Sequence, residues 1–175
     1  GFYYYGSDSE KLILRPKEFY DGDMPANKSV AAYNLIRLAR LTDKPELQQK
    51  AQRLFKAFGN EIKNNPLACS FWLWAGTYYL YPGSEIILMG KRDEPLLQDM
   101  LQAIAENNYA DWLIILADEE EKEQLTKIRP SLEALWEEYQ GQTMAFICRD
   151  GSYGQKIEDL DTLLFALQAR SLMLR

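Results

Sequence analysis

The segment that most constrains the fold is Ser29–Leu41, which is apolar almost all round. Only Asn34, Arg37 and Arg40 interrupt it, and because they recur at every third position they form one narrow polar stripe on a helix. A helix with so little polar surface has to be buried on most of its sides. The sequence therefore predicts a helix that other elements enclose.

Two further helices are expected along the chain. The first has Asp43 as an acidic cap, Pro45 in its first turn and Glu46 three residues after the cap. Its apolar residues recur in steps of three and four, which predicts an amphipathic outer helix: Leu47, Ala51, Leu54, Phe55, Phe58 and Ile62. Pro66 opens the other, LACSFWLWAGTYYLY, which is apolar nearly all round and should be buried. This order fits helical hairpins in two concentric layers, and it fits an ordinary helical layer equally well.

After Pro82-Gly83 the pattern changes to short, continuous apolar runs, which are typical of buried strands. Two helical patterns separate these runs, and Pro130 should kink or split the second helix. Strand–helix–strand–helix–strand with right-handed crossovers predicts a small, three-stranded parallel sheet. The three expected strands are 86–89, 112–117 and 143–148, followed by a final helix with Leu160, Leu163, Leu164, Leu167 and Leu174 on one face.

We therefore expect a mixed, mostly helical fold in three parts: a helical-hairpin region over 1–82, a small α/β subdomain over 83–157, and a C-terminal helix over 158–175 that packs back on the fold. A parallel sheet raises the possibility of nucleotide binding. The loop after the first strand, Gly90-Lys-Arg-Asp-Glu, lacks the glycine pattern that lets a backbone approach a pyrophosphate. Dinucleotide binding is therefore not expected.

Charge is distributed unevenly along the 175 residues. Residues 1–66 carry 11 Lys and Arg against 8 Asp and Glu, whereas residues 67–175 carry 9 against 18. An acidic chain without a Lys/Arg cluster argues against a nucleic-acid partner. The most hydrophobic segment, 67–81, is shorter than the roughly 20 residues that span a bilayer, so no membrane partner is expected. Two separated cysteines and no signal peptide favour a cytoplasmic protein.

The chain contains no histidine. This excludes Ser-His-Asp and Cys-His catalysis and His-containing metal sites. With only two cysteines, Cys69 and Cys148, a thiolate metal site is not expected either, and we predict neither a metal nor a cofactor. Carboxylates, Lys, Arg, Tyr and one thiol remain available for chemistry.

A dense charged loop precedes the first helix. A charged loop anchored to a buried helix is a usual place for a functional site, and the alternative is that its charges pair with one another and orient the loop. The charges are Arg15, Lys17, Glu18, Asp21 and Asp23, punctuated by Pro16, Gly22 and Pro25.

The same loop carries a resemblance to a known family. R-P-K-E-x-Y-D-G-x-x-P, followed after a short polar turn by S-V-A-A-x-N-L-x-R-L-A-R-L-T, resembles the thioredoxin-domain proteins related to spermatogenesis-associated protein. The likeness continues through the aromatic helix, EIILMG and TMAFIC, but covers only the C-terminal part of that family. Beyond their thioredoxin-like domain, such proteins are similar to N-acylglucosamine 2-epimerases and cellulase-type glycosidases, which are (α/α)6 toroids. The resemblance implies helical hairpins that form part of a toroid.

The resemblance also implies a substrate class, carbohydrate. Epimerases and glycosidases need an acid–base pair across a sugar, which carboxylates can supply without histidine. The alternative is a non-catalytic binding or scaffolding module. The candidate catalytic residues are Glu18 and Asp21, and the candidate substrate-binding residues are Arg15, Lys17, Asp23 and Tyr20.

The resemblance implies internal partners as well. The first half of the toroid and the thioredoxin-like domain have no counterpart in this chain, which therefore looks like a fragment of a longer protein. A partial ring exposes apolar surface where the other hairpins belong, so we expect self-association or large apolar patches.

The chain departs from the family pattern at two places. Where the family continues P-S-G-N-S-V, this chain has PANKSV over 25–30, which brings Lys28 into the turn and, if that turn lines a pocket, puts an activity in doubt. Where the family has C-x-x-x-x-C and then a proline, this chain has Cys148, Tyr153 and Lys156, so a redox or metal role for the pair is not carried over. Cys148 alone is expected to be a buried, small apolar residue. Core packing and a sugar-stacking wall both fit the aromatic helix: Phe71, Trp72, Trp74, Tyr78 and Tyr79.

Overall fold

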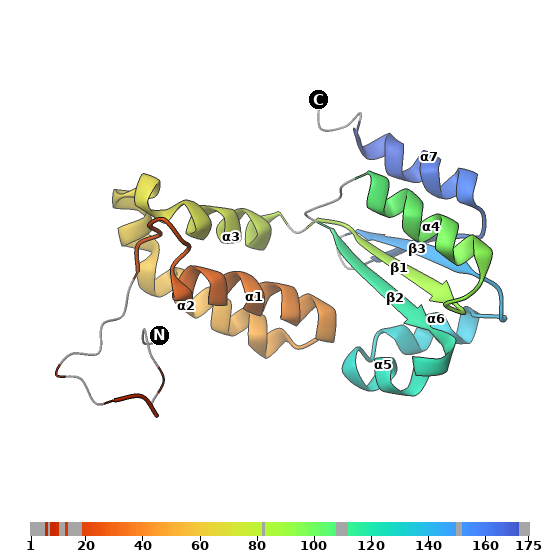
Figure 1. Ribbon diagram of the computed structural model, residues 1–175, viewed down its shortest axis with the longest axis horizontal. Coiled ribbons are helices and arrows are strands. Elements are labelled where there is room, and N and C mark those ends of the chain that lie inside the picture. Colours follow the sequence, from red (N-terminus) through yellow and green to blue (C-terminus); the bar gives the residue numbers. More distant parts are fainter. Residues whose placement is uncertain are drawn as a thin grey trace. The chain divides into compact units, whose positions relative to one another are not determined.

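The computed structural model describes residues 6, 8–10, 13, 19–81, 83–107, 112–149 and 152–171, in two compact units. The first ends at Tyr81 and is called the helical unit below. The second begins at Pro82 and is called the α/β unit. A mixed and mostly helical fold is thereby confirmed (Figure 1). The helical unit contains α1 (Asn27–Thr42), α2 (Pro45–Asn64), the 3-10 turn η1 (Pro66–Cys69) and α3 (Ser70–Leu80).

The amphipathic character predicted for the second helix is confirmed. α2 is exposed along most of its length and turns one apolar face toward α1 and α3, where Ala51 is fully buried. Its expected start was wrong by one residue, because the N-cap is Lys44 and not Asp43. Asp43 takes up a left-handed backbone (φ 54°) that ends α1, and the Lys44 N–H binds the Ala39 carbonyl. Because only two residues separate the helices, Asp43 terminates the first helix and cannot cap the second.

The burial predicted for the two apolar helices was too extensive. α1 buries one face, with Ala32, Ile36 and Ala39 at its centre, and leaves Leu38 and Leu41 exposed. α3 likewise buries one face and exposes a side chain or two in each of its turns. Three helices can offer each other only a limited contact area, so a helix that is apolar all round keeps an uncovered side.

The α/β unit is built on a four-stranded sheet of order β2-β1-β3-β4. Helices α4 and α7 cover one face of this sheet, and α5 and α6 cover the other (Figure 1). The elements are β1 (Glu85–Gly90), α4 (Pro95–Glu106), β2 (Leu113–Asp118), η2 (Glu119–Glu121), α5 (Lys122–Ile128), α6 (Leu132–Glu138), β3 (Met144–Arg149), β4 (Ser152–Ile157) and α7 (Leu160–Ser171).

The predicted three-stranded parallel sheet was wrong. β1 and β2 are parallel, but β3 runs antiparallel to β1 and forms a hairpin with β4. The reason lies at Pro130, which separates α5 from α6. Two helices in one connection reverse the chain once more than a single helix does, so the chain enters β3 from the opposite end of the sheet. β4 escaped prediction because its sequence, SYGQKI, has no continuous apolar run.

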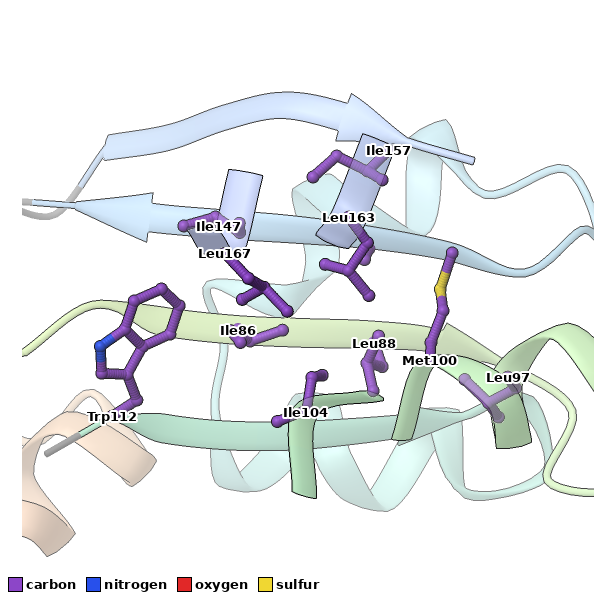
Figure 2. Packing of buried hydrophobic residues seen from close by; sticks show 11 residues of the cluster. Ile86, Leu88, Leu97, Met100, Ile104, Trp112, Ile147, Ile157, Leu163 and Leu167 are labelled. Carbon is purple, nitrogen blue, oxygen red and sulfur yellow. The ribbon is translucent and has the colours of Figure 1, made fainter. Parts of the chain in front are cut away.

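The core between the sheet and α4/α7 is a cluster of buried aliphatic side chains with one indole (Figure 2). Ile86 and Leu88 of β1 are fully buried there, opposite Leu97 and Met100 of α4. α7 contributes Leu163 and Leu167 to the same cluster, so the C-terminal helix belongs to the α/β unit. Each such side chain stabilises the fold by roughly 1.5–3 kcal/mol on burial. Of the helices that the structure describes, none combines the length and the hydropathy that crossing a bilayer requires.

Candidate functional site

Half of the predicted site can be placed. Arg15, Lys17 and Glu18 lie outside the described residues. Tyr20 and Asp23 are both exposed, and the Tyr20 ring packs edge-on against Phe19. Asp21 differs from these two residues, because it is half-buried between the loop and two helix starts.

Both carboxylate oxygens of Asp21 are engaged by hydrogen-bond donors. Oδ1 accepts the backbone N–H of Ala26 at 2.8 Å and the hydroxyl of Ser29 at 2.6 Å. Oδ2 accepts the backbone N–H groups of Phe71 at 2.9 Å and Trp72 at 3.2 Å. The Asp21 N–H in turn binds the Ala68 carbonyl at 2.9 Å. One side chain therefore joins the loop to the beginnings of α1 and α3.

The two helix starts need such a group. The first N–H groups of a helix have no partner within the helix, and a side chain at the N-cap position usually supplies one. Here the N-caps of α1 and α3 are Ala26 and Cys69, and neither side chain makes a capping bond. Asp21 supplies the missing acceptor to both helices, and its negative charge suits the positive ends of their dipoles.

This arrangement fits a structural role better than proton transfer. A carboxylate has about four lone-pair sites, and the four donors around Asp21 occupy that capacity. Within the described part of the loop the other carboxylate is Asp23, which is exposed, so no acid–base pair is assembled there.

The turn that departs from the family pattern lies against the protein interior. Asn27 and Lys28 form the first positions of α1, and Lys28 is 2% exposed. Its Nζ lies 4.8 Å from the centre of the Phe58 ring, on α2, in a cation–π contact. Ser29 is also fully buried and holds Asp21. The lysine in this turn is thus buried against an aromatic ring of α2.

The aromatic helix divides into core and surface residues. Trp72 is fully buried among Phe19, Phe55 and Phe58, and Tyr78 is 4% exposed, so both serve core packing. Trp74 is 50% exposed. The polar stripe of α1 meets this helix, because Arg40 donates a hydrogen bond to the Tyr78 hydroxyl at 3.0 Å.

Both thiols are free and buried. Cys148 is 5% exposed in β3, and burial, followed by the nearby Glu85 carboxylate, raises its pKa to about 12, although Arg129 acts in the opposite direction. Burial, and then the charge of Asp21, likewise raise the pKa of Cys69. Tyr153 lies opposite Cys148 in the β3–β4 register, at the place of the family's second cysteine.

A cavity of about 480 Å³ that the sequence did not indicate lies at the carboxyl ends of β1 and β2. Parallel strands commonly bind ligands at this edge, which is the signal that could have drawn attention to it. Arg92 lines the cavity, with its Nε 3.1 Å from Asp118 Oδ2. Within the described residues no group of three or more Cys, Asp or Glu side chains could hold a metal ion. The lining residues are Lys91, Arg92, Asp93, Asp118, Glu120 and Glu121.

No family model matches this chain. It is similar to spermatogenesis-associated protein 20 of Homo sapiens, with 26% identity over 159 residues that make up 89% of this chain. The proteins of the same name from Rattus norvegicus and Mus musculus are 28% and 27% identical over 135 residues, or 75% of this chain. The chain spans only about a fifth of the length of these relatives (20% and 17%). The similarities support the relationship that the loop motif indicated.

Proposed function

We propose that this chain is a non-catalytic module whose helical unit packs against a helical surface of a longer protein. This proposal rests on one observation: hydrogen-bond donors occupy both carboxylate oxygens of Asp21, one of the two predicted catalytic residues. With that carboxylate committed to two helix starts, the charged loop serves to hold the helical unit together.

The surface that would make the contact is exposed and apolar. We define the α1/α3 face as the exposed apolar side chains of these two helices, with exposed fractions of 45% for Leu38 and Leu73, 50% for Trp74 and 67% for Leu80, together with Leu41. Large apolar side chains left exposed on neighbouring helices are suited to a contact surface. The relatives are about five times longer than the matched segment, so their chains contain ample sequence to cover such a face.

The resemblance to toroid proteins supports a specific version of this proposal. In it, α1–α3 are hairpin helices of a partial (α/α)6 ring, and the first half of the ring and a thioredoxin-like domain belong to the same longer protein. Self-association of the isolated chain through the α1/α3 face is a further part of the proposal. Buried, free Cys69 and Cys148 fit a reducing compartment, so we also propose a cytoplasmic location.

A carbohydrate ligand is the second candidate, and one observation favours it. Tyr20 is 51% exposed in the charged loop, three residues before the exposed Asp23. An aromatic face beside a hydrogen-bond acceptor is suited to a sugar ring. In this version the loop binds carbohydrate through Tyr20 and Asp23, and Asp21 only shapes the loop.

Turnover and unfolding, measured together, test the proposal. The wild type, Asp21→Asn and Asp23→Ala would be assayed for hydrolysis and epimerisation on a panel of mono- and disaccharides that includes amino sugars, and each would be unfolded in urea. We expect no turnover by the wild type and a loss of stability in Asp21→Asn. Turnover by the wild type that Asp21→Asn abolishes without destabilising the fold would contradict the proposal. Sugar binding without turnover that Asp23→Ala weakens would establish the second candidate.

A further inference from the structure

Arg37 has an unusual environment for a half-buried cation. Its Nη1–H donates to the Tyr33 hydroxyl at 2.9 Å, and its guanidinium carbon lies 5.7 Å and 5.9 Å from the ring centres of Tyr33 and Tyr78. The hydrogen bond to Tyr33 is the main cause that raises the Arg37 pKa. Among the described residues Arg37 forms no ion pair with a carboxylate. The tyrosines thus orient a guanidinium that has five N–H donors and uses one of them.

The surroundings of Arg37 are basic and apolar. Neither α1 nor α3 contains an Asp or Glu, and their charged residues are Lys28, Arg37 and Arg40. Lys28 is buried and Arg40 donates to the Tyr78 hydroxyl, so we consider the charge of Arg37 alone. An uncovered face with this composition is complementary to a partner that combines carboxylates with apolar side chains.

Helical spacing places apolar side chains next to this guanidinium. Leu41 lies one turn beyond Arg37 along α1, and Trp74 lies one turn before Tyr78 along α3. An amphipathic helix binds such a surface through apolar anchors spaced by three or four residues, with polar residues at the border. The exposed indole of Trp74 and the Leu41 side chain would receive the anchors, and Arg37 would receive a carboxylate.

We propose that the α1/α3 face binds an acidic amphipathic helix, with a Glu or Asp of that helix paired to Arg37 and its apolar side chains covering Trp74 and Leu41. This rests on the proposed function and adds the chemistry of the partner. Arginine suits the role because its planar fork can bind a carboxylate through two parallel hydrogen bonds. The Tyr33 hydroxyl already fixes the orientation of that fork, which lowers the entropy lost on binding.

Trp74 provides a direct readout of the face. The chain has four tryptophans, and Trp72, Trp112 and Trp136 are at most 4% exposed, so acrylamide quenching of the intact protein reports on Trp74. The probe is a synthetic helix of roughly 20 residues with Leu on one face and Glu at the borders. A matched peptide carries Lys at the Glu positions. Trp74→Phe, which should remove the quenchable signal, is the control for the readout.

We expect the Glu peptide to protect Trp74 from quenching and the Lys peptide to leave it accessible. Arg37→Gln should weaken binding of the Glu peptide about tenfold, as loss of one charge-assisted contact predicts, and Arg37→Lys should weaken it less. Arg53→Gln is the matched control, because Arg53 is exposed on α2, away from this face. Thermal unfolding of each variant establishes that it is folded.

The outcomes separate the two proposals. Equal protection by both peptides would overturn the acidic-partner inference and leave the packing function standing. Protection by neither peptide would overturn both. Selective protection by the Glu peptide with no loss in Arg37→Gln would show that Arg37 is not the anchor and would overturn the inference in that form.

Discussion

The Oδ2 atom of Asp21 accepts the backbone N–H of Phe71 at 2.9 Å, across 50 residues of chain. This bond brings the beginning of α3 to the loop that precedes α1, and Ser29 and Ala26 hold the other oxygen from the α1 side. The two helices have poor capping residues of their own, and one carboxylate serves both. The charged loop therefore holds the starts of α1 and α3 together through one residue, Asp21.

A buried ion pair joins the α5–α6 connection to the sheet. Arg129 Nη2 lies 2.6 Å from Glu85 Oε2, with the two side chains 8% and 15% exposed. Arg129→Met should lower the free energy of unfolding by about 3–5 kcal/mol because it leaves the Glu85 charge buried beside Cys148 without this partner. Urea unfolding of Arg129→Met, Glu85→Leu and the double variant measures the interaction free energy between the two side chains.

The double variant should lose less stability than the sum of the two single ones, since neither charge is then left alone. The pair Lys156–Glu158, which is much less buried, is the comparison, and Lys156→Ala should change stability by less than about 1 kcal/mol. A loss of similar size in Arg129→Met and Lys156→Ala would contradict the importance of the buried pair.

Gly90, the last residue of β1, has no room for a side chain. A Cβ at this position would lie 2.6 Å from the Thr143 hydroxyl, and Thr143 is buried and bonded to Glu94. Gly90→Ala should therefore destabilise the α/β unit by about 1–3 kcal/mol. Gly59→Ala is the matched control, because Gly59 lies in α2 with nothing within 4 Å of the added Cβ.

Gly59→Ala should stabilise the protein by about 0.5–1 kcal/mol, since alanine loses less conformational entropy in a helix. Thermal unfolding of both variants checks the pair. The two substitutions should change stability in opposite directions. A Gly90→Ala variant as stable as the wild type would show that Thr143 can move aside at little cost.

Much of the fold could be predicted from local patterns, and the errors have a common cause. The apolar runs around Ile86 and Ile115 and the break at Pro130 were visible in the sequence, because strand burial and proline chemistry are local properties. The direction of β3 depends on how many times the chain reverses before it reaches the sheet. The exposure of Trp74 depends on how many helices surround α3. The periodicity of apolar residues predicts neither the number of chain reversals nor the number of neighbouring helices.

The candidate site shows the same limit. The sequence singled out Asp21 because an acidic residue in a glycine- and proline-rich loop fits either chemistry or loop architecture. Which of the two applies depends on the amides of Phe71 and Trp72, which come close only after α3 has folded against α1. The charged cavity beside Arg92 and Asp118 was missed because no glycine motif marks it.

Two groups on one side of the sheet should make stability fall at high pH. Burial raises the pKa of Cys148 to about 12 from an ordinary value of 9.0, and that of Tyr139 to about 12 from 10.0. The folded state thus holds both protons more tightly than the unfolded state does, so their stabilisation is complete below about pH 9 and is lost as the pH rises toward 12.

Urea unfolding between pH 8 and pH 11 checks this dependence. The fall in stability should become shallower in Cys148→Ala and in Tyr139→Phe, even though each substitution also changes packing at every pH. Native Cys148 should also react with iodoacetamide far more slowly than the same thiol in urea. Rapid alkylation of the folded protein at pH 8 would contradict the burial of this thiol.

Neighbouring tryptophans on α3 should respond very differently to substitution. Trp72→Ala should cost about 3–5 kcal/mol, because it empties a fully buried site among aromatic rings. Trp74→Gln should change the stability of the isolated chain by less than about 0.5 kcal/mol and should reduce its self-association. Chemical unfolding and sedimentation equilibrium test the two effects. A large loss of stability in Trp74→Gln would mean that α3 is enclosed on both sides.

Amide hydrogen exchange at Phe71 and Trp72, compared between the wild type, Asp21→Asn and Asp23→Ala, tests the structural role of Asp21 most directly. In the wild type and in Asp23→Ala these two amides should be protected, because Asp21 Oδ2 accepts both. In Asp21→Asn their exchange should accelerate and the free energy of unfolding should fall by about 1–3 kcal/mol, the cost of poorly satisfied buried donors. Unchanged exchange and stability in Asp21→Asn would contradict the capping role and return Asp21 to the catalytic candidates.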